Sequence, residues 1–204
     1  KGKVAIITGG TVGIGLAIAR AFAREGVLTL ICGRDGERAS REAKAIEREF
    51  GLPSVGLEAD VSQAGAAELC AAEAEKRFGG IDILVNNAGT GSNETVMEAA
   101  DERWQYYWDL HVMGAVRFSR AVVPSMKKRG GGVIVSTASI CAKQPLGYEP
   151  IYNTTKAALV MFGKCLSNEL IPFNIRVNTV NPGLVLTPDW KKTAGIHTEG
   201  TGTT

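Results

Sequence analysis

Short apolar segments alternate with longer helical patterns along most of this chain, and this alternation constrains the fold more than any other feature. The apolar segments predict strands at Val4–Thr8, Leu28–Cys32, Ser54–Glu58, Ile81–Val85, Val133–Thr137 and Ile175–Val180. The segments between them predict helices at Gly13–Glu25, Glu37–Phe50, Ala64–Phe78, Asp101–Lys128 and Tyr152–Leu170. Such a chain is expected to form an α/β fold, with a mostly parallel sheet, helices on both faces and right-handed crossovers.

Composition narrows the class of protein. With 204 residues, of which 45% are hydrophobic and 22% charged, we expect one globular domain spanning residues 1–204. A net charge of +2 gives no electrostatic reason to expect nucleic acid or an anionic membrane surface as a partner. No apolar run approaches the roughly 20 residues of a spanning helix, and the N-terminus reads as a strand rather than a secretory signal.

Cysteine usage and the tail add two expectations. The four cysteines lack metal-ligand spacing, so we expect reduced thiols in a cytoplasmic protein and no metal site; they are Cys32, Cys70, Cys141 and Cys165. The last residues, Gly195–Thr204, are rich in glycine and threonine and lose all periodicity, so they are expected to be mobile.

A glycine-rich turn separates the first predicted strand from the first predicted helix. Its sequence is Thr8-Gly9-Gly10-Thr11-Val12-Gly13-Ile14-Gly15, with the spacing Gly-x-x-x-Gly-x-Gly. Glycines at this place let backbone N–H groups approach a pyrophosphate at the helix N-terminus. The turn therefore predicts nucleotide binding, the alternative being a tight turn without a ligand.

The second predicted strand is followed by an arginine and an acid. Arg34 comes straight after Gly33, and Asp35 follows it. An arginine here suits the 2′-phosphate of NADP, whereas an acid holds the ribose 2′-OH of NAD. The sequence favours NADP(H) and leaves NAD(H) open, and the pair could also be a loop with no ligand.

Polar residues mark the ends of the later strands. Asp60-Val61, Asn86-Asn87-Ala88-Gly89, Ser139 and Asn181-Pro182-Gly183 follow the third, fourth, fifth and sixth predicted strands. Each of these segments alone could have a purely structural role; the two asparagines, for example, could form an Asx turn. Ligands of open parallel sheets lie beyond the carboxyl ends of the strands, so together these residues predict one binding site.

A tyrosine and a lysine lie four residues apart at the start of the last predicted helix. Tyr152 and Lys156 therefore share a helix face, and the ammonium favours the ionised phenol, lowering a pKa that is about 10 when unperturbed. Such a tyrosine can transfer a proton near neutral pH. By itself the spacing is common and fits a surface pair equally well, so the convergence with the other strand ends decides the interpretation.

The predicted helix Asp101–Lys128 carries an apolar stripe that includes Trp104 and Phe118, which is more typical of a core or a subunit interface than of a ligand site. His111 lies within it, and a single histidine on a helix is usually structural.

Taken together, these residues resemble the short-chain dehydrogenase/reductase superfamily in its classical branch, over Lys3 to about Thr187. The resemblance rests on the glycine turn, Asp60, Asn86-Asn87-Ala88-Gly89, Ser139, Tyr152-x-x-x-Lys156 and Asn181-Pro182-Gly183. It implies a Rossmann-like three-layer α/β/α fold with a doubly wound parallel sheet, here lacking the usual C-terminal edge strand. The overall look is similar to 3-oxoacyl-[acyl carrier protein] reductases, but enzymes acting on sugars, steroids and small ketones share these motifs.

The resemblance also implies roles for single residues. Tyr152 would be the general acid of carbonyl reduction, Lys156 would lower its pKa and hold the nicotinamide ribose, and Ser139 would polarise the substrate oxygen. Asp60 would meet adenine, while the backbone of Val185 and the hydroxyl of Thr187 would orient the carboxamide. The implied cofactor site comprises Gly9, Thr11, Gly13, Ile14, Gly15, Arg34, Asp60, Val61, Asn87, Ala88, Gly89, Tyr152, Lys156, Pro182, Gly183, Val185 and Thr187.

The sequence departs from the family pattern in two places. Where the family usually has an asparagine that bends the helix and holds a water through its backbone carbonyl, this chain has His111. In the family this water links the lysine to solvent and replenishes the proton of the tyrosine. A backbone carbonyl survives substitution, so we expect this proton relay to be retained here, with the imidazole in a structural role. Family members also usually continue some tens of residues further, so residues 188–204 are expected to be either a mobile tail or a truncated substrate-loop region.

The resemblance leads to a main hypothesis and two alternatives. The first is an NADP(H)-dependent oxidoreductase that interconverts a carbonyl and a secondary alcohol, active as a homodimer or homotetramer. The second is a family member that binds nucleotide without catalysis, as a sensor or assembly subunit. The third, an adaptor without a cofactor, is disfavoured because the glycine turn is complete.

Overall fold

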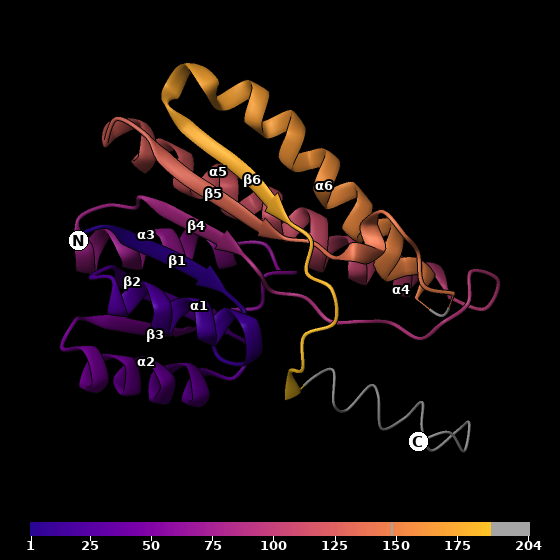
Figure 1. Cartoon of the computed structure of the whole chain (residues 1–204), viewed down its shortest axis with the longest axis horizontal. Helices are drawn as coiled ribbons and strands as arrows, with labels where there is room; N and C mark the ends of the chain where they lie inside the picture. The colour runs from indigo at the N-terminus through magenta and orange to yellow at the C-terminus, as the bar shows by residue number, and fades with distance from the viewer. Residues whose placement is uncertain (148, 189–204) are drawn as a thin grey trace.

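The computed structural model describes residues 1–147 and 149–188, and within them a six-stranded sheet forms the centre of the molecule (Figure 1). Its strands are β1 (Val4–Thr8), β2 (Leu28–Gly33), β3 (Ser54–Glu58), β4 (Ile83–Asn86), β5 (Gly132–Thr137) and β6 (Ile175–Val180). Neighbouring strands are parallel and lie in the order β3-β2-β1-β4-β5-β6. The sheet therefore grows in opposite directions from β1 and β4, and ligands of such sheets bind beyond the carboxyl ends at this reversal.

Helices cover the sheet on both faces. They are α1 (Gly13–Arg24), α2 (Gly36–Phe50), α3 (Ala66–Phe78), α4 (Asp101–Trp108), α5 (Gly114–Lys128) and α6 (Pro150–Leu170). A π-helical turn, η1 (Asp109–Met113), joins α4 to α5, and two 3₁₀ turns, η2 (Ile140–Ala142) and η3 (Ile171–Phe173), flank α6. Helices α1 and α2 pack on one face, while α3, α5 and α6 pack on the other.

The side chains of β1 show how the strands fill two cores. Ala5 and Ile7 point toward α1 and α2, whereas Ile6 points to the opposite face and joins Leu30 and Leu84 against α3 and α5. All five are fully buried. Because a strand alternates its side chains and both faces are covered, β1 is apolar throughout. Truncating one of the larger residues to alanine typically costs about 2–5 kcal/mol.

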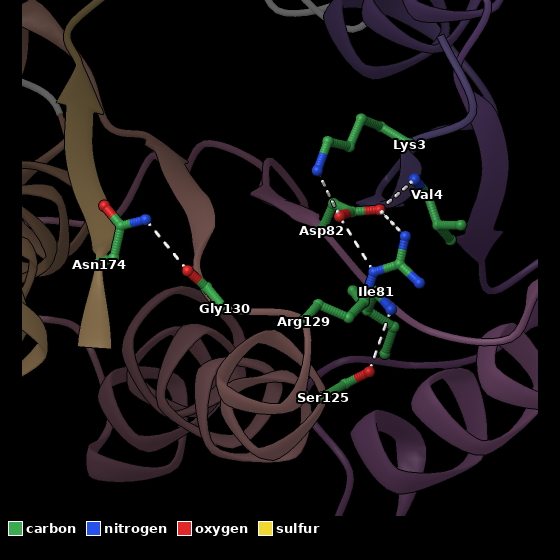
Figure 2. Close-up of polar contacts among 8 residues, drawn as sticks. All are labelled: Lys3, Val4, Ile81, Asp82, Ser125, Arg129, Gly130 and Asn174. Atoms are coloured by element: carbon green, nitrogen blue, oxygen red, sulfur yellow. Dashed lines mark hydrogen bonds and ion pairs between the residues drawn. The ribbon is translucent and has the colours of Figure 1, made fainter.

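A buried carboxylate ties the amino ends of the central strands together (Figure 2). Asp82 lies directly before β4 and accepts hydrogen bonds from Lys3 Nζ at 2.9 Å and the Val4 amide at 2.9 Å. Arg129, just after α5, donates two more through Nε and Nη2, each at 3.0 Å. Beside this group the Ser125 hydroxyl accepts a hydrogen bond from the Ile81 amide at 3.0 Å. These contacts of Asp82, called the anchor below, all lie at the amino ends of the strands, so the carboxyl ends remain available for other contacts.

The structure confirms the predicted parallel α/β fold, and most element boundaries agree within two residues. The strand predicted from Ile81 begins at Ile83, because Ile81 and Asp82 are engaged in the anchor at the strand base. The helix predicted at Asp101–Lys128 contains a π-helical turn, which the sequence pattern did not reveal. Strand β6 is the edge strand of the described sheet. No helix among the described residues is both long and apolar enough to cross a membrane. The predicted mobile tail lies outside the described residues, apart from Pro188 at its start.

Candidate active site

The glycine turn after β1 is held against the end of β4 by two side chains. The Thr8 hydroxyl accepts hydrogen bonds from the Asn87 amide at 2.9 Å and the Ala88 amide at 3.1 Å. In return, Asn87 Nδ2 donates to the carbonyl oxygens of Thr8 and Gly9, at 3.1 and 3.3 Å. A Cβ on Gly15 would lie 2.2 Å from the Gly9 carbonyl oxygen, so only glycine fits there. The turn and Asn87 thus form one rigid unit at the centre of the sheet.

Helix α1 begins in this unit with its first amide groups uncapped by any side chain. The residue before it, Val12, makes no side-chain cap, and the first turn carries no acidic residue. A Cβ on Gly13 would come no closer to another residue than 3.5 Å, to Cγ2 of Thr187. An uncapped helix N-terminus opening on backbone of Gly13, Ile14 and Gly15 suits an anionic group such as a pyrophosphate.

The loop after β2 separates the roles of Arg34 and Asp35, which the sequence left open. Asp35 caps α2: its Oδ1 accepts from the Arg38 amide at 2.8 Å, and its carboxylate lies 3.5 Å from the Arg38 guanidinium. Arg34 is exposed, and its guanidinium lies 3.5 Å from the hydroxyl of Tyr106. A Cβ on Gly33 would lie 2.9 Å from Thr11 Oγ1, so the threonine hydroxyl and the arginine flank the same strand end. The acid is engaged by its own helix, while the arginine remains available to an anion.

The residues after β3 lie next to a small cavity. Asp60 Oδ1 accepts hydrogen bonds from the amide and the hydroxyl of Ser62, at 3.0 and 2.7 Å. Val61 is buried and lines a cavity of about 10 Å³ together with Asn86, Ala88 and His111. This is about the space that one water needs. Asn86 brings to this cavity a buried Nδ2 that has no hydrogen-bond partner among the described residues.

Lys156 is the buried cation of the site. Its ammonium donates to the carbonyl oxygen of Thr137, at the end of β5, at 2.8 Å. It lies 5.4 Å from the centre of the Tyr152 ring, so the two side chains share a face of α6 as predicted. Burial lowers the pKa of Lys156 from 10.5 to about 8, because removing an ammonium from water disfavours its charged form.

Ser139 follows β5 and caps the short turn η2. Its Oγ accepts a hydrogen bond from the Cys141 amide at 3.2 Å, and the residue is 7% exposed. Since one lone pair of the hydroxyl is engaged in this way, its proton remains to be donated elsewhere. Ser139 therefore has a hydroxyl proton to donate at the carboxyl end of β5, directly before η2, which packs against α6.

His111 lies in the π-helical turn and is 2% exposed. Its ring packs edge-on against Tyr152, with centroids 5.6 Å apart and planes at 85°. Burial, reinforced by the nearby charge of Lys156, holds the pKa of His111 well below its usual value of 6.5. The imidazole is therefore neutral at physiological pH.

The segment after β6 crosses from the serine toward the glycine turn. The carbonyl oxygen of Pro182 accepts from the Ile140 amide at 2.9 Å, which fixes this segment beside η2. Further along, the Thr187 amide donates to the Val185 carbonyl at 2.8 Å, and the Thr187 methyl group faces Gly13. Gly183 and Val185 are exposed between these two contacts.

The structure adds residues to which sequence reasoning gave no role. Thr8 belongs to the glycine turn, and a hydroxyl at the end of a strand is a sequence signal for the contact that it makes with Asn87 and Ala88. Thr155 and Thr90 both bind His111, and no sequence signal pointed to either. Gly89, which the sequence places in the cofactor site, has a further contact: a Cβ there would lie 3.0 Å from His111 Nε2 and 3.3 Å from Lys156 Nζ.

Together, the strand order, the uncapped first helix and the polar residues at the carboxyl ends define a dinucleotide-binding α/β protein. The family model for short chain dehydrogenases matches residues 3–195, and the chain therefore belongs to the short-chain dehydrogenase/reductase family of oxidoreductases.

Relatives and solved structures agree with this assignment. Dehydrogenase/reductase SDR family member 4 of Oryctolagus cuniculus is 42% identical over 186 residues, which are 91% of this chain and 71% of the relative. The Homo sapiens protein of that name is 40% identical over 187 residues, covering 91% of this chain and 66% of the relative. The chain thus spans about two thirds of the length of these relatives.

Among solved structures, L-sorbose reductase from Gluconobacter frateurii, complexed with NADPH and L-sorbose, has a TM-score of 0.95 and 55% identity over 99% of this chain and 77% of that chain. A short-chain type dehydrogenase/reductase from Mycobacterium marinum has a TM-score of 0.91 and 32% identity, over 98% of this chain and 79% of that chain. None of these similarities singles out the 3-oxoacyl reductases.

Proposed function

We propose that this protein is an NADP(H)-dependent reductase that converts a polyhydroxy ketone of the ketose class to the corresponding alcohol. The observation that carries the proposal is the buried ammonium of Lys156, held by Thr137 beside the phenol of Tyr152. A buried cation next to a tyrosine has a chemical use, since it stabilises the phenolate left after proton transfer. Similarity to an L-sorbose reductase at 55% identity supports the cofactor and the substrate class.

The residues at the strand ends fit a dinucleotide. The uncapped start of α1 and the glycines before it would take the pyrophosphate. Arg34 and Thr11 would take the 2′-phosphate, because Asp35 is engaged as a helix cap and does not compete. The other proposed contacts are Asp60 and Val61 at the adenine, Asn87, Ala88 and Gly89 along the adenosine side, and Pro182, Gly183, Val185 and Thr187 around the nicotinamide.

The proposed mechanism assigns each proton to a side chain. When bound, the nicotinamide supplies the hydride that reduces the carbonyl carbon. Ser139 donates a hydrogen bond from its hydroxyl to the substrate oxygen and keeps its proton, because the Cys141 amide already occupies one of its lone pairs. Tyr152 then transfers a proton to that oxygen, and Lys156 stabilises the phenolate. In alcohol oxidation, Tyr152 takes the proton back.

We also propose that the protein acts as a homodimer or homotetramer. The long helix α6 exposes Met161, which is 64% accessible to solvent. Ile171, directly after this helix, is 69% accessible. Large apolar residues on the outer surface of one helix suit burial against a second copy. Light scattering at micromolar concentration tests this, and a monomer of about the chain's 21.6 kDa would contradict it.

The experiment that tests the function is NADPH oxidation against a panel of carbonyl compounds. We expect turnover with L-sorbose or another ketose, and much less with a 3-oxoacyl thioester or an unsubstituted cyclic ketone. A fluorescence titration with NADPH runs in parallel. Binding of NADPH without turnover of any ketone would instead support the non-catalytic nucleotide-binding alternative, and absence of binding would refute both.

A further inference from the structure

Both ring nitrogens of His111 are engaged, and their partners belong to different parts of the site. Nε2 lies 3.3 Å from the amide nitrogen of Thr90, in the loop after β4. Nδ1 lies 2.8 Å from the hydroxyl of Thr155, on α6 between Tyr152 and Lys156. The imidazole therefore spans the space between the loop that carries Gly89 and the helix that carries the tyrosine and the lysine.

The chemistry of the partners determines the tautomer of the ring. The Thr90 amide can only donate, so Nε2 must be unprotonated and accept. In the neutral ring the proton then lies on Nδ1, which donates to Thr155 Oγ1. The Thr155 hydroxyl then donates its hydrogen bond to the carbonyl oxygen of Ile151 at 2.9 Å, or to that of Tyr152 at 3.1 Å. These hydrogen bonds therefore all run in one direction, from the Thr90 amide through the imidazole and the Thr155 hydroxyl to a backbone carbonyl of α6.

The loop is packed as tightly as it is hydrogen-bonded. A Cβ added to Gly89 would meet the His111 ring at 3.0–3.1 Å and the Lys156 ammonium at 3.3 Å. The backbone at Gly89 therefore lies close to both the imidazole and the ammonium, with no room for a side chain between them. A second anchor holds the same loop from α4, where the Tyr107 hydroxyl donates to the Gly91 carbonyl at 2.7 Å.

From these contacts we infer that His111 is a positioning residue that clamps the loop at Gly89 and Thr90 to helix α6. The clamp sets the distance between the backbone proposed to line the cofactor and the ammonium of Lys156. The imidazole does this through two hydrogen bonds, the Thr90 arm at Nε2 and the Thr155 arm at Nδ1. Each of these two arms can be removed separately. The inference rests on the proposed function only for what the loop contacts, since the clamp itself is a property of the protein without ligand.

The first test is the tautomer of His111, read from the ¹⁵N chemical shifts and one-bond couplings of its ring in the ligand-free protein. We expect a protonated Nδ1 and an unprotonated Nε2 at neutral pH. A proton on Nε2, or a ring averaged between the two tautomers, would overturn the clamp regardless of whether the protein turns over any substrate.

The second test separates the two arms by substitution. The amide of asparagine reaches the place of Nδ1, so His111→Asn keeps a partner for Thr155 and leaves the Thr90 amide without an acceptor. Glutamine places an oxygen near Nε2, so His111→Gln keeps the acceptor for Thr90. A lost hydrogen bond of ordinary strength corresponds to about a fivefold to tenfold faster exchange of the Thr90 amide hydrogen. We expect that acceleration in His111→Asn and near-parental protection in His111→Gln.

The Thr155 arm is tested by Thr155→Val, which keeps the shape and removes the acceptor for Nδ1. The matched control is Thr154→Val, the same change at the exposed neighbouring position on α6. We expect Thr155→Val to loosen the loop and raise the Kd for NADPH severalfold, while Thr155→Ser restores both and Thr154→Val alters neither. Should Thr90 exchange and NADPH affinity stay at parental values in both His111→Asn and Thr155→Val, the clamp is refuted. If the parent protein oxidises no NADPH with any ketone but the variants show the predicted exchange pattern, the clamp stands and only the proposed function is contradicted.

Discussion

Lys156 donates a hydrogen bond to the carbonyl oxygen of Thr137 at 2.8 Å, and this contact joins the face of α6 that carries Tyr152 to the end of β5. Thr137 lies two residues before Ser139, so one hydrogen bond sets the position of the proposed cation relative to the proposed serine donor. It also explains how a lysine that is 3% exposed is accommodated, since a charged hydrogen bond offsets part of the cost of burial.

Burial of Lys156 makes the stability of the protein depend on pH. Its pKa falls from 10.5 to about 8 on folding, so between these values the unfolded chain binds more protons and stability rises with pH. The penalty is fully present below pH 8 and is lost as the pH approaches 10.5. Relative to Lys156→Met, the parent should gain on the order of 2–3 kcal/mol across this window. Urea unfolding at pH 7.5 and 10.5 measures this difference, and parallel changes in the two proteins would contradict the burial of the charge.

Arg34 should determine the choice between NADP(H) and NAD(H). We expect Arg34→Ala to weaken NADPH binding by about tenfold or more, as the loss of a charge-assisted contact to phosphate implies, with little effect on NADH. The matched control is Asp35→Asn in the same loop, which acts on the cap of α2 and should leave the preference for NADPH unchanged. Fluorescence titrations with both cofactors decide the matter; equal affinities in the parent would show that the arginine is not the selector.

Asp82 should be a major source of stability far from the site. Burial raises its pKa, but hydrogen bonds from Arg129, Lys3 and the Val4 amide outweigh that effect, and the pKa lies below its usual value. Asp82→Asn should therefore cost about 3 kcal/mol at neutral pH, because Arg129 loses its partner in a partly buried place. Stability from a carboxylate with a lowered pKa is lost as pH falls through the folded value, so the difference should shrink below about pH 4. Denaturation of both proteins at pH 7 and pH 3 tests this.

The imidazole of His111 should not titrate in the pH profile of the reaction near neutrality. Its pKa lies well below 6.5 because of burial and the charge of Lys156, so an inflection between about pH 6 and 7 cannot arise from it. We expect His111→Asn to raise the KM for NADPH through the loosened loop while the shape of the kcat profile is retained. Disappearance of an inflection in that range would make the imidazole a participant in proton transfer.

The sequence predicted the fold well because its signals are local. The apolar periodicity, the glycine turn and the spacing of Tyr152 and Lys156 each depend on a few neighbouring residues, and the structure agrees with all three. The role of Asp35 was also within reach, since an acid just before a helical segment is a typical N-cap.

The contacts of His111 were out of reach of sequence reasoning. His111 lies in a π-helical turn and contacts Thr155 on α6, and the loop backbone approaches its ring only because residue 89 is a glycine. Both are tertiary features, and the apolar pattern of the helix continues through the turn without a break. The same holds for the bond from Lys156 to Thr137, which joins elements that are adjacent only in the folded sheet.

The most direct measurement of the central claim is NADPH-dependent reduction of a ketose by Tyr152→Phe compared with the parent. The substitution removes the proposed proton donor and keeps the ring that packs against His111, so the fold and NADPH binding should be retained. We predict that kcat falls by about 10²- to 10⁴-fold, while the Kd for NADPH, measured by fluorescence in the same samples, stays within about twofold of the parental value, a difference of about 0.4 kcal/mol in free energy. A Tyr152→Phe protein that reduces the ketose at a near-parental rate would contradict the proposed mechanism.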